Sequence, residues 1–106
     1  MEKKIIYNVT VKIDLSSHED WITWMQEKHI PDVMATGYFN SYKLSKILYT
    51  DESDGITYAI QYLCNSIGDL EDYQKNCAAQ LQKEHTDRYK DKYVAFRTLL
   101  EVENEG

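Results

Sequence analysis

The 106-residue sequence predicts an α+β domain whose elements follow the order β-α-β-β-α-β. Residues 4–15 and 56–64 alternate apolar and polar side chains, as half-buried strands do. Residues 16–36 and 66–89 instead repeat apolar side chains at helical spacing. Residues 38–50 fit no helical stripe well, and we interpret them as a strand. Residues 92–103 divide into two alternating faces, and we interpret them as the last strand. Together these observations predict two helices and four strands.

The first helix is expected to follow the first strand directly. Ser16 and Ser17 can cap it, and acidic residues then fall in its first turn, near the positive end of the helix dipole. Pro31 should break or kink this helix, because proline lacks an amide donor and disfavours helical geometry in the residue before it. Gly37 fits the left-handed position that closes a helix C-terminus. Residues 21–39 therefore predict a kinked aromatic helix that covers one face of the sheet.

The second and third strands are expected to form a hairpin. Residues 38–50 carry apolar side chains at both parities, so the face that meets the core stays ambiguous, and a bulge would reconcile the two. The polar turn at residues 51–55 ends in glycine and joins the two strands.

The second helix and the last strand complete the pattern. Ser66, with Asp69 three residues later, resembles a capping box, and the helix should run to about residue 88 or 89. In the last strand, we expect the side chains of Val94, Phe96, Thr98, Leu100 and Val102 to share the covered face. The complete order is that of the ferredoxin-like fold, a four-stranded antiparallel sheet with both helices on one face. We expect residues 1–106 to be one such domain.

Charge and hydropathy exclude several classes of partner. The chain has 18 acidic against 12 basic residues, a formal net charge of −6. Phosphate backbones and anionic lipid would repel such a domain, so we expect neither nucleic acid nor a membrane as partner. No segment approaches the ~20 apolar residues of a membrane span. A cytoplasmic location is the simplest expectation.

The sheet face without helices is expected to be semi-polar. We assign to it the following side chains: Ile6, Asn8, Thr10, Lys12, Thr57, Ala59, Gln61, Leu63, Tyr93, Ala95, Arg97, Leu99 and Glu101. A purely solvated face would carry more Lys and Glu. We therefore expect two copies to pack through this face as a homodimer, which could also enclose a small-molecule cavity.

Four segments carry a resemblance to a known family. They are IIYNVTV from Ile5, the block W-x-x-W-M-x-x-x-H-I-P-x-V-x-x-T-G-x-F from Trp21, TYAIQY from Thr57 and KYVAFRTLLEV from Lys92. The sequence resembles an uncharacterised bacterial family catalogued as a domain of unknown function. This resemblance implies no activity, cofactor or catalytic residue.

More distantly, the element order is similar to that of the dimeric α/β-barrel superfamily. Its members include small cofactor-independent monooxygenases and haem-degrading enzymes. The resemblance implies, for haem degradation, an Asn on the first strand, a Trp on a later strand and a His on the second helix. Asn8 fits the first position, but both tryptophans lie on the first helix and His85 lies at the far end of the second. Haem degradation is therefore disfavoured.

The candidate ligand-binding residues are Asn8, Tyr58, Gln61, Arg97 and His29. His29 could act as a base or contact a ligand, or it could cap the helix C-terminus. Arg97 could bind an anion bidentately, with Lys43 and Gln61 joining it, or pair with a carboxylate across a dimer. No catalytic set is evident.

We predict no metal and no cofactor. His18 and His29 would lie about 16 Å apart on a helix, too far to share an ion, and His85 is isolated in the sequence. Cys64 and Cys77 have no metal-type spacing, and we interpret both as small buried hydrophobes.

Two classes of function remain. The first is a non-enzymatic homodimeric module that binds a small ligand or a protein partner, and the missing catalytic set favours it. The second is a cofactor-independent, monooxygenase-like enzyme that acts on a small aromatic or quinone-like substrate near Asn8, Tyr58, Gln61 and Arg97.

Overall fold

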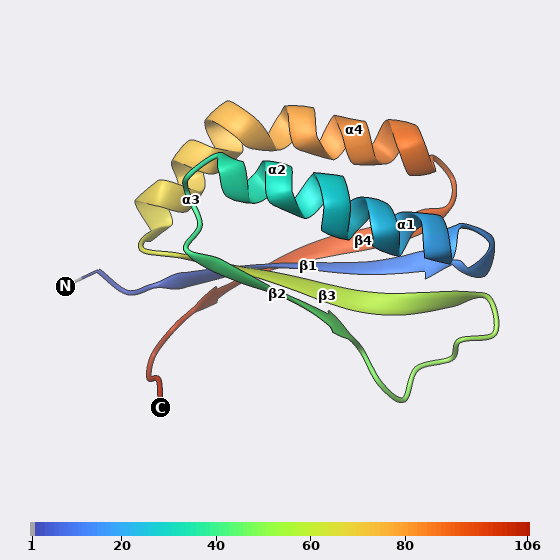
Figure 1. The fold of residues 1–106 in the computed structure, drawn as a ribbon. Helices are drawn as coiled ribbons and strands as arrows, with labels where there is room; N and C mark the ends of the chain where they lie inside the picture. The colour runs from blue at the N-terminus through green and yellow to red at the C-terminus, as the bar shows by residue number, and fades with distance from the viewer. Residues whose placement is uncertain (1) are drawn as a thin grey trace.

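The computed structural model describes residues 2–106 and has the predicted order of elements. Strands β1 (Ile5–Asp14), β2 (Ser41–Lys46), β3 (Gly55–Cys64) and β4 (Tyr93–Glu101) form one antiparallel sheet in the order β2-β3-β1-β4. Two helical runs cover one face of this sheet, and the other face carries none (Figure 1). This is the predicted ferredoxin-like architecture.

The first helical run continues through Pro31 instead of breaking there. After a short 3-10 turn, η1 (Leu15–Ser17), it consists of α1 (His18–Trp24), the π-helical turn η2 (Met25–His29) and α2 (Ile30–Ala35). Proline is tolerated in the first turn of α2, because the wide turn before it already changes the hydrogen-bond pattern. The expected cap by Ser17 is also absent, since its side chain makes no capping hydrogen bond.

The second helical run is built in the same way. It consists of α3 (Ile67–Tyr73), the π-helical turn η3 (Gln74–Ala78) and α4 (Ala79–Tyr89). The hydroxyl of Ser66 accepts a hydrogen bond from the backbone N–H of Asp69 at 3.1 Å, as the capping pattern predicts. The extra residue in η3 moves the buried stripe from Cys77, which is half-buried, to Ala78, which is buried.

Gly37 closes the first helical run with a positive φ of 84°. We expect Gly37→Ala to lower the free energy of unfolding by about 1 kcal/mol, because this left-handed conformation strains any residue with a Cβ. Lack of space is not the reason, since a Cβ there would meet no heavy atom within 4 Å. Urea titration measures the loss. Gly37→Asn should lose less, and an unchanged stability in the Ala variant would contradict this interpretation.

Strand β4 faces the opposite way from the sequence-based expectation. Its register places Tyr93, Ala95 and Arg97 opposite Ile13, Val11 and Val9, which face the helices. The open face instead receives Val94, Phe96, Thr98 and Leu100. Both parities of this strand carry apolar residues, so the pairing with β1 decides the orientation. Val94 and Phe96 are consequently 68% and 63% exposed.

The open face is therefore more apolar than predicted on the side of β4. Its polar part lies on β1, β3 and β2. There Gln61 of β3 is paired with Asn8 of β1 on one side and with Lys43 of β2 on the other. Asn8 is nonetheless buried, and its side-chain amide donates to the hydroxyl of Thr10 at 3.0 Å. We use the name β4 stripe for Val94, Phe96 and Leu100.

Within the described residues, no helix is long and apolar enough to span a membrane.

Candidate functional site

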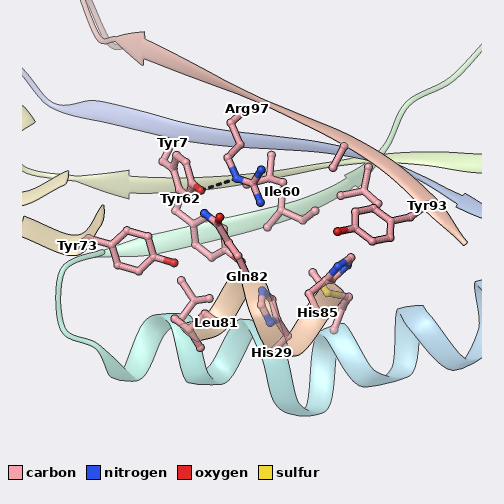
Figure 2. Close-up of a pocket in the computed structure, with 15 residues that line it drawn as sticks. Tyr7, His29, Ile60, Tyr62, Tyr73, Leu81, Gln82, His85, Tyr93 and Arg97 are labelled. Carbon is pink, nitrogen blue, oxygen red and sulfur yellow. Dashed lines mark hydrogen bonds between the residues drawn. The ribbon is translucent and has the colours of Figure 1, made fainter. Parts of the chain in front are cut away.

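A cleft lies between the sheet and the two helical runs, on the covered face (Figure 2). Its enclosed volume is about 40 Å³. Its lining comes from three strands, β1, β3 and β4, and from both helical runs: Tyr7, Val9, Val11, Met25, His29, Val33, Ile60, Tyr62, Tyr73, Leu81, Gln82, His85, Tyr93, Ala95 and Arg97. The π-helical turn η2 contributes to this geometry, since Met25 and His29 at its two ends both line the cleft. Such turns are frequent at functional sites.

Arg97 is the cation of the cleft. Figure 2 shows its side chain reaching from β4 toward Tyr62 and Gln82. Its Nε donates a hydrogen bond to the hydroxyl of Tyr7 at 2.9 Å. Within residues 2–106, no carboxylate lies within ion-pair distance of Arg97 and its two Nη groups make no hydrogen bond to the protein. The guanidinium is thus held in place by a neutral partner and keeps a free edge.

His29 and His85 lie together on the helical side of the cleft, with ring centroids 5.7 Å apart. Burial lowers the pKa of each histidine to about 4, and for His85 the nearby charges of His29 and Arg97 lower the pKa further. For His29, the carboxylates of Glu84 and Asp32 oppose the effect of burial. Both rings are therefore neutral at physiological pH.

Trp21 fixes the tautomer of His85. Its indole Nε1 donates to Nε2 of His85 at 2.9 Å, in a fully buried position. An indole N–H can only donate, so Nε2 of His85 must accept, and the proton of the neutral ring sits on Nδ1. A proton on Nε2 would break this hydrogen bond. His85 is thereby held as a neutral donor.

Two tyrosines of the cleft, Tyr62 and Tyr73, also remain neutral. Burial raises the pKa values of Tyr62 and Tyr73 above their ordinary value. Their hydroxyls can donate and accept hydrogen bonds but supply no negative charge at physiological pH.

The structure separates the predicted ligand residues into three places. Arg97 and His29 line the cleft together. Asn8 and Gln61 pair with one another on the open face. Tyr58 faces the helices, but its hydroxyl lies 2.7 Å from Nε2 of His18, outside the cleft lining.

Two further expectations for these residues are wrong. Lys43 and Gln61 do not join Arg97, because the reversed orientation of β4 puts Arg97 on the other face. His29 does not cap a helix C-terminus, because the helical run continues to Ala35.

His85 is the site residue that sequence reasoning missed. It is isolated in the sequence, 64 residues from its partner Trp21. The sequence feature that points to His85 is its position four residues after Leu81 and four before Tyr89, on one face of the helix. All three residues are buried. Extending the apolar stripe of the second helix by two turns would have found it.

No group of three His, Cys, Asp or Glu side chains in the described part of the chain is placed to hold a metal ion. The two cysteines are free, with Cys64 buried and Cys77 half-buried.

Comparison with known proteins decides the family. Residues 4–103 match a family described as a domain of unknown function, DUF4286. The chain belongs to this family. A search of curated proteins finds no match.

Several solved structures share the fold at low sequence identity. An EthD-like protein from Ralstonia eutropha JMP134 has a TM-score of 0.71 and 14% identity, with 100% of this chain and 97% of that chain covered. A dimeric ferredoxin-like protein from an uncultured marine organism has a TM-score of 0.67 and 10% identity, with 99% and 100% covered. A candidate antibiotic biosynthesis monooxygenase from Bacillus cereus has a TM-score of 0.66 and 8% identity, with 98% and 97% covered. At such identities the likeness extends to the fold alone.

Proposed function

We propose that this protein is a homodimeric module that binds a small molecule in the cleft between helices and sheet. The supporting observation is the convergence of Arg97, His29 and His85 on a cleft that is otherwise walled by apolar and aromatic side chains. Of these three groups, His85 is buried and accepts its hydrogen bond from Trp21, His29 is half-buried beside it, and Arg97 is an exposed residue whose guanidinium reaches the same cleft. An apolar pocket with a few convergent polar groups is the usual form of a ligand site.

The ligand site is tested by chemical-shift mapping of the ¹⁵N-labelled protein with a fragment set of acids, phenols, amides and amines. We expect the perturbed resonances to cluster on residues that line the cleft, the side-chain Nε–H of Arg97 included. Hits confined to the open face, or no hit in any chemical class, would contradict the proposal.

The proposed dimer packs the open faces of two copies together. The β4 stripe supports it, because exposed contiguous apolar side chains on a sheet are characteristic of protein interfaces. Two structural neighbours of this chain are described as dimeric ferredoxin-like proteins. The cleft lies on the other face and would stay accessible in such a dimer.

We expect Phe96→Glu to convert the dimer into a monomer, because a carboxylate would be buried against the apolar stripe of the partner copy. Sedimentation velocity at micromolar concentration measures the change. Tyr49→Glu is the matched control, since Tyr49 is a fully exposed aromatic residue in the β2–β3 connection, and it should leave the dimer intact. A monomeric wild-type protein would rule out the dimer.

A cofactor-independent monooxygenase that acts on a small aromatic or quinone-like substrate is the second candidate. The observation that favours it is His29, a half-buried neutral imidazole in the same cleft as Arg97, which could accept a hydrogen bond from a phenolic substrate. Structural neighbours described as candidate monooxygenases agree with this option. Oxygen uptake with 1,4-naphthohydroquinone tests it: an enzyme should exceed the rate of autoxidation and lose this excess in His29→Gln. A rate equal to that of autoxidation would exclude the enzyme, and the binding module would then remain as the proposed function.

A further inference from the structure

We infer that the cleft recognises a monocarboxylic acid, whose carboxylate binds the free edge of Arg97 and whose apolar body lies toward the β4 edge of the cleft. This inference rests on the proposed function, since it names the class of ligand for the same cleft.

The guanidinium of Arg97 is arranged to bind a planar acid. Its Nε donates to the hydroxyl of Tyr7, which fixes the plane of the group, and no carboxylate in residues 2–106 pairs with the charge of this exposed residue. The two Nη groups remain as donors, and they match the two oxygens of one carboxylate in a bidentate pair. Arg88 differs in this respect, because the carboxylate of Asp20 already pairs with its charge.

The charges of the cleft favour an anion that carries a single negative charge. The chain has 18 Asp and Glu residues, yet none of them lines the cleft. Arg97 contributes the positive charge, while His29 and His85 stay neutral because they are buried. One uncompensated cation balances one carboxylate, whereas a phosphate dianion or a dicarboxylate would bring a second charge into a site that supplies no second cation.

The size of the cavity sets the direction in which the ligand binds. About 40 Å³ is well below the ~150 Å³ of a cavity that holds benzene, so only a head group of a few atoms fits inside. The body of the ligand must then extend toward solvent. Leu99 follows Arg97 on the same face of β4, lies opposite Tyr7 and is 47% exposed, so it offers an apolar contact there.

Five probes test this inference by isothermal titration and chemical-shift mapping. Benzoate and benzamide have nearly the same shape but differ in charge, hexanoate and acetate differ in the length of the apolar body, and inorganic phosphate controls for anions in general. We expect benzoate to bind at least about tenfold more tightly than benzamide, because hydrogen bonds to charged groups are the stronger ones. Hexanoate should bind more tightly than acetate, and phosphate should bind most weakly.

Variants at two arginines separate a specific site from a general effect of charge. Arg97→Gln should bind benzoate and benzamide equally, and Arg97→Lys should keep only part of the preference, because an ammonium group lacks the planar fork. Arg88→Gln removes a cation outside the cleft and should behave as wild type. Circular dichroism verifies that each variant is folded, which is expected because Arg97 lies at the exposed edge strand.

The outcomes distinguish failure of the carboxylate inference from failure of the proposed binding function. If benzamide shifts the cleft resonances with the same affinity as benzoate, the cleft binds small molecules but the carboxylate inference is wrong. The same holds if phosphate binds as tightly as benzoate. If no fragment of any class perturbs the cleft, the proposed binding function fails together with the inference.

Discussion

Acidification from pH 7 to pH 5 is expected to destabilise the protein by about 2 kcal/mol for each of His29 and His85. Both have a folded-state pKa of about 4 against an ordinary value of 6.5. Between these two values the unfolded chain binds more protons than the folded one, so the free energy of unfolding falls as the pH falls through this range. Above pH 6.5 the contribution is fully present. Urea titration at pH 7, 6 and 5 measures it.

The variants His29→Gln and His85→Gln, alone and combined, show how much of this pH dependence comes from each histidine. Each substitution should remove about half of the difference between pH 7 and pH 5, even where it changes the stability at pH 7. His18→Gln is the matched control, since His18 lies outside the cleft, and it should retain the wild-type dependence. Equal slopes for wild type and the double variant would show that the two histidines are not buried as neutral groups.

Trp21 is expected to be the most sensitive position of the core around the cleft. Its side chain is fully buried and its ring lies 5.3 Å from that of Tyr58, so Trp21→Ala should cost about 4 kcal/mol of stability. Trp21→Phe keeps most of the packing but leaves Nε2 of His85 without its donor, at a cost of about 1–3 kcal/mol. Urea titration at pH 7 measures both losses.

The Phe variant should also raise the pKa of His85 toward its ordinary value, because Nε2 is then free to accept a proton. An NMR titration of the imidazole resonances measures the pKa of His85 directly. Trp24→Phe is the control: Trp24 is half-buried and stacks on His29 at 5.1 Å, and its loss should cost less than about 1 kcal/mol and leave the pKa of His85 unchanged. A pKa of His85 that is the same in wild type and Trp21→Phe would contradict the tautomer assignment.

Local patterns were sufficient to predict most of the fold. In β1 and β3, one parity is apolar and the other mostly polar, so the covered face could be recognised from the residues alone. The cap at Ser66 is likewise a local interaction between neighbours in sequence. In β4, Val94 and Phe96 at one parity compete with Tyr93 and Leu99 at the other, and only the register with β1 resolves them.

The candidate site was harder to predict, because tertiary contacts create it. Arg97 and His29 were recognised as chemically unusual residues, but the strand orientation that brings them together was not. His85 gains its role from Trp21, far away in the sequence. The π-helical turn η2, which carries His29 into the cleft, leaves no clear signal in the order of residues.

The proposed ligand site is the cleft on the helical side and not the open face. A crystal structure of protein that is purified without any step to strip ligands tests it most directly. We expect a small molecule with its acidic group at Arg97, within reach of His29, and two copies in contact through their open faces. A ligand held between the two sheets beside Asn8 and Gln61, with the cleft unchanged, would contradict it.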